Sequence, residues 1–387
     1  MMKRIFFLIF VCFFFFSNAF ATDLMLLQKE VEKIRGLSFK EKIKFEYISQ
    51  KKVSNILSKE LSRQYTEKKL GNYETALKVF GLIPKKSNLK DIVQNLMSSQ
   101  VAGIYDNKSK KMYILDTSRE FEDDDFFQLS KALNLDDIFI VHELAHALTD
   151  QNFDLEKSLN LDNFENEDKQ IACLSVAEGD ATLVMVRHLV KTMNVPEANL
   201  SDIEELMSNL NFYDQFLGET IPRYLRETLI FPYTKGLKFV SFVSKGENLK
   251  KIDQLYLKTP ASTEEIIHPE KYINQNNKPV EIKINLSNIK KKGGLVKIWE
   301  GTWGELGTKI ILQEWKVDEN RAVLASEGWG GDRYIVYKNG QGEILFFWKT
   351  VWDSEKDAKE FEDALKTRKD LIVLKKGKEI TVELKGR

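Results

Sequence analysis

The stretch DIFIVHELAHALTDQ, residues 137–151, decides which fold we expect for this chain. Its apolar residues recur at the spacing of an amphipathic helix, and Asp137 suits the positively polarised start of that helix. Only four histidines occur in the whole chain, and two of them, His142 and His146, lie in this stretch. Positions four apart are stacked on the same face of a helix. We therefore predict a helix over residues 137–151 that points two imidazoles at one metal ion.

A glutamate directly follows the first of these histidines and completes the pattern HExxH. On a helix, Glu143 would project beside the two imidazoles, toward a water molecule on the metal. Zinc suits this set of groups, because it binds imidazole nitrogen and a catalytic zinc site keeps one position open for water. We predict His142 and His146 as ligands of Zn²⁺, and Glu143 as the general base that takes a proton from the water.

A catalytic zinc site needs a third protein ligand, which must come from another segment. A second helical run covers residues 169–191 and contains the phrase AEGDAT, in which Glu178 is the candidate ligand. The more acidic segment before this run contains three rival carboxylates: Glu165, Glu167 and Asp168. A glutamate on a later helix completes the zinc site of the gluzincin group of metallopeptidases, and in this respect the chain resembles that group.

More closely, the chain resembles exported bacterial zincins that carry HELxHALxDQ followed by EGDA. In those proteins the glutamate of EGDA is the natural third ligand, and phrases of the type FPYxxG and PxSTxxxxHPEKY recur downstream. The resemblance covers about residues 100–275 and implies zinc-dependent hydrolysis of peptide or protein substrates. One position departs from thermolysin-like enzymes, which carry an aspartate where this chain has Thr182. A carboxylate that orients a ligand histidine must then come from elsewhere, with Asp150 and Asp180 as candidates.

Hydrolysis of an amide also benefits from a hydrogen-bond donor for the oxyanion that develops on the substrate carbonyl. The candidate donors are His268, Tyr272, Tyr233 and Tyr105. We predict His268, in the segment PASTEEIIHPEKY over residues 260–272, as the catalytic partner of Glu143. The alternative is that His268 has only a structural part, as a histidine that hydrogen-bonds a turn.

The first residues of the chain have the pattern of a secretory signal. Lys3 and Arg4 precede an apolar run over residues 5–16, and a small-residue cleavage site ends at Ala21. We expect a signal peptide over residues 1–21, export to the periplasm or the extracellular space, and no stable membrane anchor after cleavage; an uncleaved anchor is the alternative. Basic and acidic side chains number 58 each, and this balance disfavours nucleic acid and anionic membranes as main partners.

Two domains are expected in an α+β protein. Residues 22–275 should form a mostly helical zincin-like domain with a small β-hairpin or sheet, and residues 276–387 an α+β domain. The alternative is that residues 276–387 are not a separate domain and pack into the zincin cleft. The hairpin is predicted over residues 101–116. One of its strands, at residues 102–105 or 112–115, would bind an extended peptide at the edge of the sheet. The alternative is an ordinary structural hairpin.

Local patterns predict further elements on both sides of the domain boundary. In the first domain we expect helices at 121–133 and 201–216, and a helix break at 231–236, where the sequence reads FPYTKG. In the C-terminal domain we expect a hairpin turn at 339–342. The remaining C-terminal elements are helices at 304–315 and 355–366 and strands at 280–286, 321–328, 334–338 and 344–352.

Three functions are compatible with these observations. The first is an exported zinc-dependent metallopeptidase with Glu143 as the general base. The second is an exported zinc-binding interaction or assembly module that retains a non-catalytic zincin site. The third is a zinc hydrolase that acts on a non-peptide amide or ester. The intact Glu143 favours an enzyme, because a site kept only for structure would not need the base.

Overall fold

The computed structural model describes part of the chain, and the described residues are 23–64, 66–99, 103–115, 135–160, 166–192, 221–245, 248–274, 278–284 and 295–385. The predicted signal peptide and the helices predicted at residues 121–133 and 201–216 lie outside these ranges. Within the described ranges, no helix is both long and apolar enough to span a membrane.

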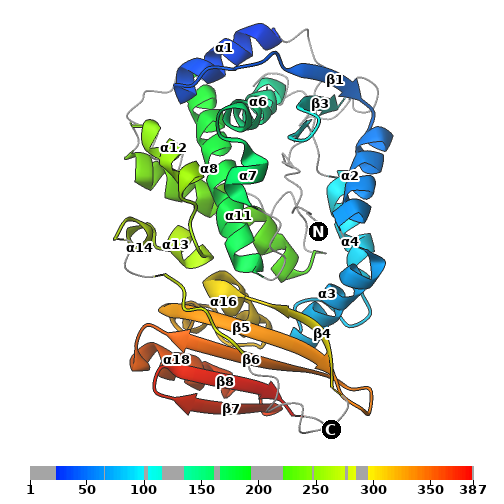
Figure 1. The fold of residues 1–387 in the computed structure, drawn as a ribbon, viewed down its shortest axis with the longest axis vertical. Coiled ribbons are helices and arrows are strands. Elements are labelled where there is room, and N and C mark those ends of the chain that lie inside the picture. The colour runs from blue at the N-terminus through cyan, green and yellow to red at the C-terminus, as the bar shows by residue number, and fades with distance from the viewer. Residues whose placement is uncertain are drawn as a thin grey trace.

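A mostly helical part and a C-terminal sheet part make up the molecule (Figure 1), which confirms the predicted α+β class. The helical part contains α1 (Leu24–Arg35), β1 (Lys44–Ile48), α2 (Gln50–Gln64), α3 (Glu67–Phe80), α4 (Leu89–Ser99), β2 (Gly103–Asp106), β3 (Lys111–Leu115), α6 (Leu135–Phe153), α7 (Leu155–Leu159), α8 (Glu167–Thr192), α11 (Arg223–Ser244), α12 (Lys250–Leu257), α13 (Thr263–Ile267) and α14 (Pro269–Asn274). The C-terminal part contains β4 (Val296–Gly301), α16 (Gly304–Glu314), α17 (Glu319–Leu324), β5 (Trp329–Lys338), β6 (Ile344–Trp352), α18 (Glu355–Leu365), β7 (Leu371–Lys376) and β8 (Glu379–Leu384).

A small sheet lies against the helices in the order β1–β3–β2. The β2–β3 hairpin confirms the hairpin predicted over residues 101–116, and β2 pairs with β3 in the antiparallel direction. The sequence did not predict β1, which pairs parallel to β3 along its other side. Because β3 is paired on both sides, the suggestion that residues 112–115 form the edge strand is wrong. The edge strands of the described sheet are β2 and β1.

Helices α6 and α8 form the centre of the helical part. Both predicted helices are confirmed and are slightly longer than expected, since α6 begins at Leu135 and α8 extends from Glu167 to Thr192. Side chains are buried nearly all round α8, which is typical of a helix that other elements cover on every side. Polar side chains on such a helix lie out of water and need partners.

Helix α11 runs unbroken from Arg223 to Ser244 with Pro232 inside it, so the predicted break at residues 231–236 is wrong. The reason is the contact with α8, where two glycines let the helix backbones touch. A Cβ atom placed on Gly179 would lie 2.3 Å from the Gly236 carbonyl oxygen, and one on Gly236 would lie 2.4 Å from the Ser175 carbonyl oxygen. This tertiary contact outweighs the cost of a proline inside a helix.

The C-terminal sheet has the order β4–β5–β6–β8–β7, and all neighbouring strands are antiparallel. The structure confirms the strands predicted at 334–338 and 344–352, both C-terminal helices and the turn at 339–342. The strand predicted at 321–328 is wrong, because the segment begins as α17, which the Asp318 side chain caps. Residues 280–284, the described part of another predicted strand, are also not a strand.

Glu167, at the first position of α8, joins the helical part to the C-terminal part. Its carboxylate accepts hydrogen bonds from the Trp299 indole at 3.1 Å, the Tyr334 hydroxyl at 3.0 Å and the Thr302 amide at 3.2 Å. Burial raises the pKa of Glu167 to about 7, although these hydrogen bonds act in the opposite direction. The next residue, Asp168, accepts hydrogen bonds from the Thr263 amide and hydroxyl in α13.

Asp332 is a second buried carboxylate that accepts several hydrogen bonds, in this case inside the C-terminal part. Its two oxygens accept hydrogen bonds from the main-chain amides of Trp303 and Gly304, at the start of α16. The indoles of Trp329 and Trp348 donate to the same carboxylate. Burial raises the pKa of Asp332 to about 6, again against the effect of its donors. Four donors around one buried carboxylate account for its place in an otherwise aromatic core.

Candidate metal centre

Two histidines of α6 and one glutamate of α8 bring three ligand atoms to one point. The Nε2 atoms of His142 and His146 lie 2.9 Å apart, and the Glu178 Oε2 atom lies 3.2 Å from the first and 3.4 Å from the second. All three side chains are buried. Tetrahedral zinc with bonds of about 2.0 Å places its ligand atoms about 3.3 Å apart, so this donor set fits a zinc ion. Among the described residues, these three form the group that could hold a metal.

The electrostatics of the three side chains also suit a cation. Burial lowers the pKa of His142 to about 3 and the pKa of His146 well below its usual value, so both imidazoles are neutral at physiological pH. Burial and the nearby Glu143 carboxylate raise the pKa of Glu178, while a hydrogen bond from Tyr233 lowers it. Neutral imidazole is the form that binds metal, and a divalent cation would compensate the buried carboxylates.

Glu143 lies next to the edge strand of the small sheet. The carboxylate is fully buried, and its Oε2 atom accepts a hydrogen bond of 2.7 Å from the main-chain amide of Tyr105 in β2. The residue after the first candidate histidine ligand therefore contacts one of the two strands that the sequence proposed as a peptide-binding edge. The sequence could not indicate this contact, because any residue except proline at position 105 has the same amide.

Tyr233 is the candidate donor that the fold brings to the three ligands. Its ring is stacked on the His142 imidazole, with centroids 5.9 Å apart and planes at 24°, and its hydroxyl forms a hydrogen bond with Glu178. Tyr233 stands three residues before Gly236 on α11, while Glu178 directly precedes Gly179 on α8. The close crossing of the two glycines therefore places the phenol beside the ligand carboxylate.

The structure gives the other candidate donors different partners. His268, at the end of α13, lies with its Nε2 atom 2.9 Å from Glu305 in α16, and it does not belong to the group of three ligands. The hydrogen bond with Glu305 raises the pKa of His268. The Tyr272 hydroxyl donates to the Lys258 carbonyl, and the Tyr105 hydroxyl donates to Asp150. The sequence could not show which of these residues lies beside His142 and His146, because contacts between distant segments depend on the fold.

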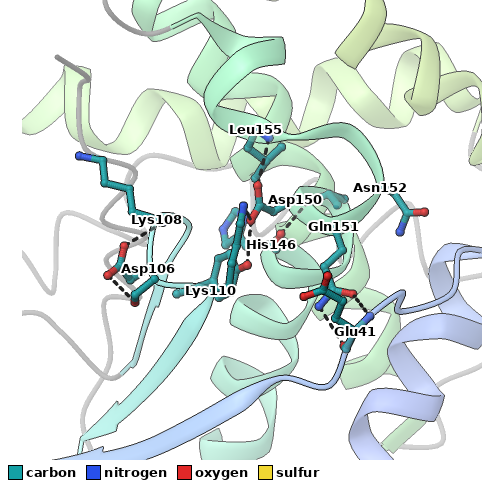
Figure 2. A network of polar contacts seen from close by, with 12 residues as sticks. Glu41, Asp106, Lys108, Lys110, His146, Asp150, Gln151, Asn152 and Leu155 are labelled. Carbon is teal, nitrogen blue, oxygen red and sulfur yellow. Dashed lines mark hydrogen bonds and ion pairs between the residues drawn. The ribbon is translucent and has the colours of Figure 1, made fainter. Parts of the chain in front are cut away.

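The carboxylates expected to orient the ligand histidines are also engaged elsewhere. Asp150 accepts hydrogen bonds from Lys110 and from the amide of Leu155, as Figure 2 shows, and from the Tyr105 hydroxyl. Asp180 accepts hydrogen bonds from Arg35 and Tyr256, on another side of α8. Asp150 thus attaches the hairpin and α7 to α6, and Asp180 attaches α1 and α12 to α8.

Comparison with known proteins concerns only the C-terminal part. The family described as "Domain of unknown function (DUF8575)" matches residues 295–379, from just before β4 to the first residue of β8. This match lies outside the segments that carry the three ligands. No curated protein and no solved structure matches the chain.

Proposed function

We propose that this chain is a zinc-dependent metallopeptidase of the zincin type, exported from the cell, with Glu143 as the general base. The observation that carries the proposal is the convergence of His142, His146 and Glu178 on one buried point, with Glu143 projecting from the same helix as the histidines. A site that only held a metal for stability would not need a carboxylate beside it.

Each residue of the site has a part in the proposed reaction. A bound Zn²⁺ would supply Lewis acidity and make water nucleophilic near neutral pH. Glu143 takes a proton from the attacking water and passes it to the leaving amine. Tyr233 takes the donor role that the sequence assigned to His268, because its hydroxyl lies at the ligand group. Its single proton, which is donated to Glu178 in the resting site, turns to the developing oxyanion in the reaction.

The edge strand β2 supports peptides as the substrate class. The Tyr105 amide points to Glu143, so in an antiparallel ladder the Tyr105 carbonyl also points away from β3, and the main chain of Gly103 does the same. These groups can pair with an extended peptide whose scissile bond then lies beside the base. A non-peptide amide or ester would gain nothing from such a strand edge.

The test is hydrolysis of an unfolded protein by the zinc-loaded chain, with Glu143→Gln at equal zinc content. The substituted side chain keeps an oxygen for the Tyr105 amide but cannot accept the proton, so we expect kcat to fall by about 10²- to 10⁴-fold. Glu156→Gln, an exposed change in the neighbouring α7, should leave kcat unchanged. If wild type and Glu143→Gln bind zinc and neither cleaves peptides or non-peptide amides, the zinc-binding module is the better account.

A further inference from the structure

We propose that Tyr105 is a positioning residue, which holds the Glu143 carboxylate with its main-chain amide while Asp150 anchors its phenol. This inference deepens the proposed function, since it names the device that orients the base of the same site. Asp150 then holds the Tyr105 phenol, whereas the sequence had suggested that it orients a ligand histidine.

The first link joins the strand to the base. Glu143 Oε2 accepts the Tyr105 amide at 2.7 Å, and both residues are buried. A glutamate side chain has three rotatable bonds, so its carboxylate needs an external contact to stay in one orientation. A base that is already oriented when the substrate binds lowers the barrier, because no further ordering is needed to reach the reactive geometry.

The second link joins the same residue to the far end of the helix. The Tyr105 hydroxyl donates to Asp150 Oδ2 at 2.8 Å. Asp150 follows Glu143 by seven residues, which places the two acids on one face of α6, about 10 Å apart along its axis. Tyr105 spans this distance, with its amide at Glu143 and its phenol at Asp150. The strand is therefore fixed to the helix at two points by one residue.

Further contacts make Asp150 a rigid anchor. Its Oδ2 atom also accepts a hydrogen bond of 2.6 Å from Lys110, at the other end of the hairpin turn, and its Oδ1 atom accepts the Leu155 amide at 3.1 Å (Figure 2). The Asp150 carboxylate is completely buried. Because these groups hold it from α7 and from the hairpin, movement of Asp150 would displace the start of β3 as well as Tyr105.

The experiment separates the two links. Tyr105→Phe removes the phenol contact and keeps the amide, so kcat should fall by about 10- to 100-fold, as for a misplaced catalytic group. KM and zinc content should stay near their wild-type values. Asp150→Ala should give a similar loss, Asp150→Asn should recover part of it, and the double variant should be no worse than either single one. Tyr47→Phe, the same change at an exposed position of β1, should have no effect.

A comparison of Tyr105→Ala with Tyr105→Pro tests the amide. Both lack the phenol, but only proline lacks the N–H group, and this amide does not pair with β3. We expect the proline variant to be at least about 10-fold slower than the alanine variant at equal zinc content. Equal kcat values for these two variants, or wild-type kcat for Tyr105→Phe, would overturn the proposal.

A readout that needs no turnover distinguishes failure of this inference from failure of the proposed function. In protein labelled with ¹⁵N-tyrosine, the Tyr105 amide proton should shift upfield and exchange faster in Glu143→Ala, and in the same direction in Asp150→Ala. These changes are expected whether or not the chain hydrolyses peptides. If Asp150→Ala leaves the Tyr105 resonance and its exchange rate unchanged, the anchor is refuted even in a protein with no measurable activity.

Discussion

Helix α8 carries buried carboxylates of two kinds. At its N-terminal end, Glu167 and Asp168 accept hydrogen bonds from indole, phenol, hydroxyl and main-chain donors. At its middle, Glu178 turns one oxygen toward two imidazole nitrogens, 3.2 and 3.4 Å away. A carboxylate buried for structure is surrounded by donors from the protein, whereas one that faces two neutral nitrogen ligands is arranged for a cation. The surroundings, and not burial itself, separate the structural acids from the candidate ligand.

Asp180, two residues after Glu178, belongs to the structural kind. Its oxygens accept hydrogen bonds from the Arg35 guanidinium at 2.8 and 3.0 Å and from the Tyr256 hydroxyl at 2.9 Å. Arg35 lies in α1, so a buried ion pair attaches the N-terminal helix to the helix that carries the candidate third ligand. Removal of α1 would leave Asp180 buried without its counter-charge, at a cost of several kcal/mol. Helix α1 is therefore an integral part of the fold.

The largest effect expected from this comparison is loss of zinc. Glu178→Gln should weaken zinc binding by more than about 100-fold, the upper limit for loss of an outer-shell partner, because it removes a charged ligand directly. Glu167→Gln makes the same chemical change at the end of the same helix and should leave zinc binding intact. Metal content after dialysis against a competing chelator measures both. Zinc retained by Glu178→Gln, or lost from Glu167→Gln, would contradict the division into two kinds.

A smaller effect is expected for the pH dependence of stability. Since burial raises the pKa of Glu167 from 4.5 to about 7, its contribution to stability is fully present below pH 4.5 and is lost as the pH rises through 7. A shift of this size corresponds to about 3 kcal/mol. Glu167→Gln has no charge to bury, so its free energy of unfolding should rise relative to wild type by up to that amount between pH 4.5 and 8.

Denaturant unfolding at a series of pH values measures this difference. The exposed Glu355→Gln in α18 removes the same charge at the surface, and its difference from wild type should be flat over the range. If the stability difference between Glu167→Gln and wild type is also independent of pH, then folding does not raise the pKa of Glu167 and the prediction is wrong. The contribution of Glu167 to stability falls as the pH rises, because its pKa is raised in the folded state. An acid stabilised by an ion pair has a lowered pKa and shows the opposite dependence on pH.

The sequence predicted the elements whose signal is local. The HExxH spacing predicted α6 and placed its two histidines on one face, because spacing along a helix is fixed by the helix itself. Glu178 was selected by the resemblance to zincins that carry EGDA. The wrong predictions lie where tertiary contacts decide. Pro232 suggested a break that packing against α8 removes, and residues 321–328 suggested a strand where the Asp318 cap begins a helix.

The candidate site extends beyond what sequence patterns contain. The amide of Tyr105 contacts Glu143, but a main-chain group leaves no mark on the residue type. Tyr233 was one of four candidate donors, and the sequence analysis favoured His268, in the segment PASTEEIIHPEKY. The glycine in AEGDAT and the glycine three residues after Tyr233 were a usable signal. Glycine inside a helix is costly, and a close helix crossing is one reason to keep it.

The smallest predicted effect tests how the middle of α8 is positioned. Gly236→Ala places a Cβ atom 2.4 Å from the Ser175 carbonyl oxygen, so the helices must move apart, and overpacking of this kind costs about 1 to 3 kcal/mol. Gly71→Ala in α3, where the added atom meets nothing within 4 Å, should instead stabilise the protein slightly. Thermal unfolding measures both, and stacking of Tyr233 on His142 should weaken only in the first. If the two variants are equally stable, the glycine crossing does not set the position of Tyr233. Hydrogen bonds would then position the middle of α8, as they position its N-terminal end.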